Sequence, residues 1–256
     1  MSPERFAFLV GVAVFAGGAV GLVLQRVLPE KFTTGGPRDM IGAVVGLLTL
    51  LSALVLGLLI WTAYGVYAGQ NLAVQTLAAK VLQLDLALGD YGPEAEPVRV
   101  KVRENLAKTI DDVWLVKESD ASFVAKNFSA AVESLRNRQK ALGELHPSTD
   151  AEKRALTTAT ATIDSIAQSR LQMSFALTNP VSYPLLLMVV GWATFLFCGY
   201  GLMSKGSPMS VAAGAVGAIA IASGFYLILD LSDPYAGAFR TSSAPLEQVL
   251  AIMGKE

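Results

Sequence analysis

Few residues in this 256-residue chain could carry out catalytic chemistry. The chain holds one histidine, His146, in the turn-like stretch GELHPSTD, and one cysteine, Cys198, inside an apolar run. Neither residue predicts a metal centre, because a zinc site needs three or four convergent ligands. No nucleophile-elbow, phosphate-loop, dinucleotide-binding or metalloprotease pattern occurs. We therefore expect no catalytic residue, no metal and no cofactor, and we predict that the protein is not an enzyme.

Three charged side chains occupy positions where a charge needs an explanation. Arg170 lies on an otherwise apolar helical stripe, so it must pair or reach water. It either forms a salt bridge inside a helical domain, or lies at a subunit interface or along an aqueous vestibule. Asp230 and Asp233 lie where the last apolar segment ends. A calcium site there would need more oxygen ligands than the tail supplies. We expect these two residues to be interfacial or to cap the turn at Pro234.

Two short motifs match known functional patterns, and each has a simpler interpretation. Gly199-Tyr200-Gly201 is the tripeptide of potassium-channel filters. Here it ends a predicted spanning helix and does not lie in a re-entrant loop. Asn127-Phe128-Ser129 fits the glycosylation sequon, but Phe128 lies on the apolar stripe of a predicted helix. Neither motif predicts a site.

The composition is that of an integral membrane protein, with 53% hydrophobic and 16% charged residues. A net charge of −1 gives no reason to expect a nucleic acid partner, so membrane lipid is the expected environment. Apolar runs predict transmembrane helices at about 6–28 and 40–68, within residues 1–69, and at about 184–203 and 209–231, within residues 181–231. Residues 232–256 form a tail.

The second apolar run, 40–68, has two unlike faces. Its bulky face carries Leu54 and Trp61 and suits lipid. Small or polar residues recur on the other face at helical spacing: Gly46, Thr49, Ala53, Gly57, Ile60, Tyr64 and Tyr67. In a membrane, such a face needs either a close protein neighbour or water. We predict that it lines a pore or packs closely against another helix.

Residues 70–180 read as an amphipathic helical domain between the second and third spans. Its first helix continues without a break from the second span, and later stripes predict helices over 98–113 and 124–143. Thr149 and Glu152 predict a capping box for a further helix that ends at Asn179-Pro180. The predicted fold is therefore all-α with four spans, which puts the N-terminus, this domain and the tail on one side. Positive charges near the spans are equally numerous on both sides, so charge does not decide the orientation.

The tail resembles the closing signature of the bacterial bestrophin-like family of membrane proteins. The resemblance is carried by Asp230, Asp233, Pro234, Tyr235 and Gly237, and the order of the predicted helices agrees with it along nearly the whole chain. The sequence departs from the family pattern at Gln75, where the family usually shows a glutamate.

The chain is more distantly similar to bestrophin anion channels. That similarity implies a homo-oligomer, a pentamer in bestrophins, whose second spans surround a central pore, with both termini and the helical domain in the cytosol. Ala238, Phe239 and Arg240 replace the acidic run that bestrophins use to bind calcium, so calcium gating is not implied.

The leading hypothesis is a homo-oligomeric channel of the bacterial inner (plasma) membrane that conducts small ions, with anions expected from the resemblance. The small face carries no ring of charges that would fix the sign of the ion. The alternative is a non-conducting membrane scaffold whose helical domain docks a cytosolic partner.

Overall fold

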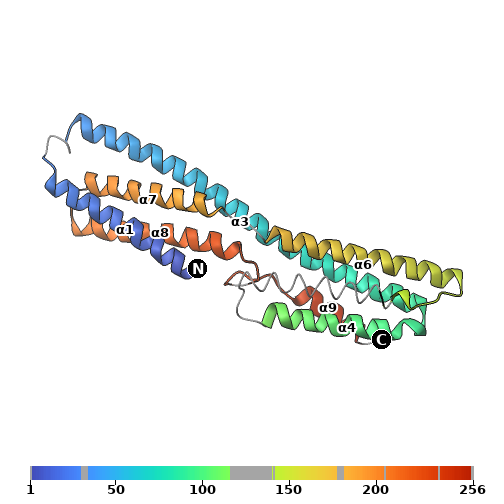
Figure 1. The fold of residues 1–256 in the computed structure, drawn as a ribbon. Coiled ribbons are helices and arrows are strands. Elements are labelled where there is room, and N and C mark those ends of the chain that lie inside the picture. Colours follow the sequence, from blue (N-terminus) through green and yellow to red (C-terminus); the bar gives the residue numbers. More distant parts are fainter. Residues whose placement is uncertain are drawn as a thin grey trace. The chain divides into compact units, whose positions relative to one another are not determined.

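The fold is all-α, as predicted, in the part of the chain that the computed structural model describes: residues 2–29, 34–115, 140, 142–177, 182–204, 206–235 and 237–254. The α-helices are α1 (Pro3–Val27), α3 (Gly36–Tyr91), α4 (Glu96–Ile110), α6 (Asp150–Ala176), α7 (Tyr183–Met203), α8 (Pro208–Leu231) and α9 (Ala244–Met253) (Figure 1). A 3₁₀ turn, Pro93–Ala95, precedes α4, and a π-helical turn, Asp111–Leu115, follows it.

Contacts within the chain divide it into two units. The membrane unit comprises Met1–Gly65 and Pro180–Ser232, and the helical unit comprises Val66–Asn179 and Asp233–Glu256. Helices α1, α3, α7 and α8 are long and apolar enough to cross a membrane, which confirms the four-span fold. Helix α3 has 56 residues and is shared by the two units, since the division falls between Gly65 and Val66.

The membrane unit is held together by a close backbone approach of α1 to α7. A Cβ atom added to Gly21 would lie 2.8 Å from the carbonyl carbon of Cys198, and one added to Gly201 would lie 2.9 Å from the Cα atom of Gly21. A Cβ atom on Gly17 would similarly lie 2.6 Å from the carbonyl oxygen of Thr194. Small residues permit such contacts between membrane helices, where packing replaces the hydrophobic effect as the main attraction.

This close packing also accounts for Gly199-Tyr200-Gly201. The tripeptide lies inside α7, and a Cβ atom on Gly199 would collide with the side chain of Val45 on α3. The Tyr200 hydroxyl lies 3.2 Å from the Thr49 hydroxyl, which binds the two helices together. The motif therefore packs helices within the membrane unit.

The helical unit has its own apolar core. The predicted stripe of α3 lies in it, since Val74, Leu77, Val81, Leu84 and Leu88 are all buried. Helices α4, α6 and α9 contribute further buried residues: Val102, Leu106, Ile163, Ile166, Leu246, Val249 and Met253. Residues 98–103 alternate apolar and basic side chains but are helical, as the longer stripe predicted.

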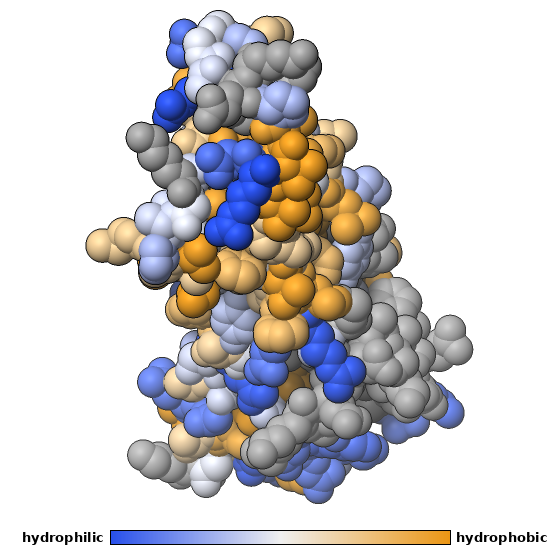
Figure 2. All heavy atoms as spheres, turned by 90° about the vertical axis from the view of Figure 1, so that its left-hand side faces the viewer, coloured by the Kyte–Doolittle hydropathy of each residue, from blue (hydrophilic) through white to orange (hydrophobic). Residues whose placement is uncertain are grey.

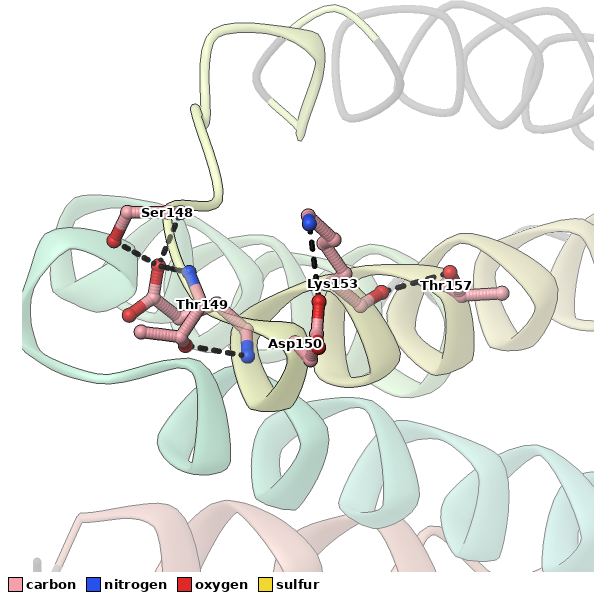
Figure 3. Close-up of polar contacts among 6 residues, drawn as sticks. Ser148, Thr149, Asp150, Lys153 and Thr157 are labelled. Carbon is pink, nitrogen blue, oxygen red and sulfur yellow. Dashed lines mark hydrogen bonds and ion pairs between the residues drawn. The ribbon is translucent and has the colours of Figure 1, made fainter.

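The predicted capping box at the start of α6 is confirmed. The Glu152 amide donates to the Thr149 hydroxyl at 3.2 Å, and the Glu152 carboxylate accepts from the amides of Ser148 and Thr149. Figure 3 shows this first turn, where Lys153 also pairs with Asp150 at 3.0 Å. Hydrogen bonds from the Ser148 amide and hydroxyl, with others from Thr149, lower the pKa of Glu152 to about 2.

Three predictions fall outside the described residues. They are the helix over 124–143, except for its last residues, the sequon Asn127-Phe128-Ser129 and the break at Asn179-Pro180.

Candidate functional site

Most of the small face of α3 lies beside, and not on, the face that packs against the rest of its own chain. Four of its predicted residues are exposed: Gly46, Ala53, Gly57 and Tyr64. The other three are half-buried: Thr49, Ile60 and Tyr67. Among the described residues, no atom lies within 4 Å of a Cβ atom added to Gly46 or Gly57. Gly46 and Gly57 therefore do not serve a close contact within one subunit.

A neighbouring face of α3 makes the contacts inside the membrane unit. Val45, Leu59 and Ala63 are buried there, and the hydroxyl oxygen of Ser52 is shielded from solvent. Thr49 borders this buried face, donates its hydroxyl proton to the Val45 carbonyl at 2.8 Å and lies near Tyr200. Thr49 thus has a packing role in its own subunit, whereas Ala53, further round the helix, is exposed.

The bulky face of α3 is also uncovered, as expected for residues that contact lipid. Leu54 is 69% exposed and Trp61 is 73% exposed. Figure 2 shows many hydrophobic residues on the molecular surface of the face it draws. A surface of this kind fits the membrane environment predicted from the composition.

Helix α3 carries no fully exposed charged side chain from residue 40 to residue 89. This stretch contains only two charged residues, Lys80 and Asp85. Lys80 donates to the Ser169 hydroxyl at 2.7 Å and to the Ser165 carbonyl at 3.3 Å, on α6. Asp85 is 1% exposed and forms a bidentate ion pair with Arg99 of α4, with both N–O distances 3.0 Å. The uncharged surface of α3 therefore extends from the membrane-spanning part into the part that belongs to the helical unit.

The predicted tail residues occupy different environments. Asp230 is buried in the last turn of α8 and belongs to the membrane unit. Pro234 and Tyr235 belong to the helical unit, where the Pro234 carbonyl accepts the Thr241 amide at 2.8 Å. The loop that this bond closes includes Gly237, whose φ of +81° favours glycine. Asp233 precedes this loop and is half-buried.

Tyr235 anchors the tail to the body of the helical unit. Its hydroxyl donates to Gln70 Oε1 at 2.9 Å, and Gln70 Nε2 donates to the Met173 carbonyl at 3.0 Å. Gln70 is 2% exposed, so its amide joins α3, α6 and the tail out of contact with water. Burial raises the pKa of Tyr235, which keeps the phenol protonated as the donor.

Trp114 adds a second anchor that the sequence did not identify as a site residue. It lies in the π-helical turn after α4, and its indole nitrogen donates to the Thr241 carbonyl at 2.7 Å. Its ring meets that of Tyr235 edge-on, with ring centroids 5.7 Å apart. Turns of π-helix are rare and are frequent at functional sites.

Arg170 has the Thr109 hydroxyl as its hydrogen-bond partner among the described residues, at 3.4 Å. The side chain is partly buried, and desolvation lowers the pKa of its guanidinium without discharging it. Both roles predicted for Arg170, in a salt bridge or at an interface or vestibule, stay predictions. No group of three or more His, Cys, Asp or Glu side chains that could hold a metal ion occurs in the described ranges.

A family model described as the bestrophin-like domain matches residues 10–246. The chain belongs to the bestrophin-like family. The resemblance seen in the tail is thereby confirmed.

Among solved structures, the chain is similar to a mutant bacterial Bestrophin homolog from Klebsiella pneumoniae. The two are 12% identical, the match covers 97% of this chain and 99% of the other, and the TM-score is 0.44. The comparison with curated proteins gave no match.

In this bestrophin-like protein, the departure at Gln75 lies on the uncharged surface of α3. Gln75 is exposed. A glutamate there would place a fully exposed charge on a helix that otherwise has none between residues 40 and 89. The glutamine therefore extends the uncharged surface into the helical unit.

Proposed function

We propose that this bestrophin-like protein is a homo-oligomeric membrane channel for small anions, with the spanning parts of α3 arranged around a central pore. The observation that carries the proposal is the small face of α3, which carries no charge and whose residues Gly46, Ala53 and Gly57 are exposed in a single subunit. Small side chains on a spanning helix need a close neighbour or water, and a ring of subunits supplies both.

Gating by dewetting suits this face better than gating by a ring of charges. Ile60 lies half-buried on the small face and could form a hydrophobic constriction when several copies meet. Such a constriction needs no fixed charge, which agrees with the uncharged surface of α3.

The preference for anions is supported by family membership, and two cations of the helical unit have neutral oxygens as hydrogen-bond partners. Among the described residues, Lys80 and Arg170 are hydrogen-bonded to hydroxyl and carbonyl oxygens and not to carboxylates. The buried carboxylate of Asp85, by contrast, is neutralised by Arg99.

We further propose that the protein lies in the bacterial inner membrane with both termini in the cytosol. Four spanning helices return the chain to the side on which it began. The helical unit follows the second span and therefore lies on that same side, as do the N-terminus and the tail.

Two neighbouring residues test whether the small face meets water. In a Cys198→Ser background, Ala53→Cys would put a thiol on the small face and Leu54→Cys would put one on the bulky face. The proteins are reconstituted in liposomes and treated with a charged, membrane-impermeant sulfonate thiol reagent while chloride and potassium fluxes are recorded. We expect chloride flux through the protein, blocked or strongly changed by modification of Ala53→Cys and unchanged for Leu54→Cys.

The same preparations contain the outcomes that would contradict the proposal. A monomer by mass measurement in detergent, or an oligomer without flux, would rule out the channel. Oligomers with flux in which both thiols stay unmodified would instead place the small face in a dry contact between subunits. A soluble partner that co-purifies in stoichiometric amount, without flux, would favour the scaffold.

A further inference from the structure

The sequence of α3 does not show where this helix leaves the membrane. Its run of uncharged residues continues from Met40 to Ala79, about twice the length that a hydrocarbon core requires. The other three spans are shorter, so the levels at which they end indicate where the membrane boundary crosses α3.

Two contacts relate the level of α3 to that of α7. A Cβ atom added to Gly42 would lie 3.2 Å from Met203 Cε, and one added to Gly199 would lie 3.7 Å from Val45 Cβ. Residue numbers therefore rise along α3 as they fall along α7, and the two helices are antiparallel.

The contact between Val45 and Gly199 gives the level at which α7 begins. The same number of residues, 16, separates Val45 from Trp61 and Gly199 from Tyr183. With a rise of about 1.5 Å per residue, both positions are about 24 Å along their helices from this contact. Trp61 on α3 and Tyr183 at the start of α7 therefore lie at about the same level.

Helix α8 becomes charged near this level. Helices α3 and α8 both continue into the helical unit, so they run in the same direction. A Cβ atom added to Gly224 would lie 3.5 Å from Leu56 Cδ2. Trp61 follows Leu56 by five residues, and Asp230, the single charged residue of α8, follows Gly224 by six.

Helix α1 agrees with α8. The ring of Phe6 lies beside that of Phe225, with centroids 6.3 Å apart, and Phe225 follows Gly224 directly. The charged residues Glu4 and Arg5 directly precede Phe6. The charges of α1 and α8 thus occur near the level of Trp61, at which α3 itself carries none.

Exposed Trp and Tyr side chains lie at this level. Trp61 is 73% exposed and Tyr183 is 60% exposed. The ring of Tyr64 lies beside that of Trp61, with centroids 6.4 Å apart. Nearer the middle of the same two helices the exposed side chains are aliphatic, such as Leu54 and Leu187. Trp and Tyr favour the headgroup region because each combines an apolar ring with a polar N–H or O–H group.

The distance to the opposite end of the spans fits the thickness of a membrane. From Met40 to Trp61, α3 rises about 30 Å, which is the thickness of a hydrocarbon core. Helix α7, Tyr183–Met203, has 21 residues and rises by about 30 Å as well. The length of the spans and the level of the charges therefore indicate the same boundary.

We propose that Trp61 and Tyr183 form an interfacial anchor, a pair of aromatic side chains that contact lipid headgroups, and that the hydrocarbon core ends on α3 at Trp61. The part of α3 that follows then lies outside the hydrocarbon core, although it stays uncharged as far as Ala79. The lipid interface is the partner because the two rings share the level at which α1 and α8 become charged. This inference goes beyond the proposed function and holds whether or not the protein conducts.

Depth-dependent quenching of tryptophan fluorescence tests the anchor. Wild type and Trp61→Phe are reconstituted in phosphatidylcholine vesicles whose nitroxide quencher is in the headgroup, near the top of the acyl chains or near their ends. The difference between the two proteins is the emission of Trp61, so Trp114 and Trp192 stay in place. We expect headgroup and upper-chain quenchers to reduce this emission strongly, and chain-end quenchers to reduce it least.

Two further variants are made in the Trp61→Phe background. Leu54→Trp puts an indole on the same exposed face seven residues earlier, and it should report a position about 10 Å deeper than Trp61. Tyr183→Trp puts an indole on α7, and it should report a depth within about 5 Å, one helical turn, of Trp61.

Three outcomes would overturn the anchor. Strongest quenching of Trp61 from the chain ends would move the boundary further along α3. Trp61 emission that no lipid-borne quencher reduces would place the ring in a contact between subunits. A depth for Tyr183→Trp that differs from that of Trp61 by more than one turn would separate the two residues. The first two outcomes need only wild type and Trp61→Phe, so they do not depend on the folding of the other variants.

Discussion

Two glycines on one turn of α1 should respond in opposite ways to the same substitution. A Cβ atom on Gly21 would collide with the backbone carbonyl of Cys198 on α7, and it would lie 2.8 Å from the carbonyl carbon. At Gly18, an added Cβ atom meets Phe197 atoms only at 3.8 to 3.9 Å, which is ordinary van der Waals contact. Gly21→Ala therefore forces two backbones apart, whereas Gly18→Ala does not.

The size of the difference follows from the kind of atom that is contacted. A backbone carbonyl cannot rotate away as a side chain can, so α1 and α7 must separate over the length of their contact. Overpacking of this type costs typically 1–3 kcal/mol, and we place Gly21→Ala at about 2–3 kcal/mol because the contacted atoms are backbone. Gly18→Ala gains about 0.8–1 kcal/mol from helix propensity. For a chain of this size, Gly21→Ala should lower the thermal midpoint by about 4–12 °C.

The assay is thermal unfolding of both purified variants in the same detergent, followed by circular dichroism. The two variants can be compared directly, because both carry a glycine-to-alanine substitution in α1 and are measured in the same detergent. They differ only in the atoms that surround the added methyl group. Equal midpoints for the two variants would refute the close crossing of α1 and α7. A Gly21→Ala midpoint above that of the wild type would refute it more strongly, because helix propensity alone would then decide the outcome.

Three further predictions concern polar contacts of the helical unit. Asp85→Ala should lower the free energy of unfolding by about 3 kcal/mol in a chemical unfolding curve, because the largely buried Arg99 loses its bidentate partner and keeps the more exposed carboxylate of Glu96 at 3.3 Å. Tyr235→Phe should lower it by about 1–3 kcal/mol and speed proteolysis of the tail, because the buried Gln70 carbonyl loses its donor. The pKa of Glu152 is about 2 in the folded state, below its ordinary value of 4.5, so its contribution is present above about pH 4.5 and lost as pH falls towards 2. Glu152→Gln should therefore reduce the difference between thermal midpoints measured at pH 6 and pH 3.

Each of these predictions has a matched control. Lys153→Ala breaks an exposed ion pair and should cost less than about 1 kcal/mol, so an equal loss from Asp85→Ala would contradict the buried pair. Tyr183 is 60% exposed, and Tyr183→Phe should change neither stability nor proteolysis of the tail. If the midpoints of Glu152→Gln keep the full wild-type difference between the two pH values, the capping carboxylate is not the group that titrates.

The spans and the helical stripes could be predicted from the sequence because they depend on local patterns. A long apolar run, a 3.6-residue period and a capping box are each contained in one segment. They can therefore be recognised without knowing which other segment the helix packs against. The start of α6 at Thr149 and the continuous course of α3 were predicted in this way.

The contacts of Gln70 and Trp114 could not be predicted, because their partners lie 165 and 127 positions away in the chain. A neutral glutamine in a long helix carries no local sign of burial. The environments of the residues on the small face of α3 could not be predicted either. Their helical spacing placed Thr49 and Ala53 on the same face. Only the packing shows that Thr49 contacts α7 and that Ala53 is exposed.

The position of the tail in the helical unit has a consequence for how the protein is made. Leu246, Val249 and Met253 of α9 fill the core that α3, α4 and α6 begin, and Tyr235 closes the bonds of Gln70. These residues follow α8, so the ribosome makes them after the last span. The core of the helical unit therefore stays incomplete until the last span has been made and inserted into the membrane. A nascent chain that stops after α8 would hold all four spans and an unfinished domain, a state suited to recognition by quality-control proteases.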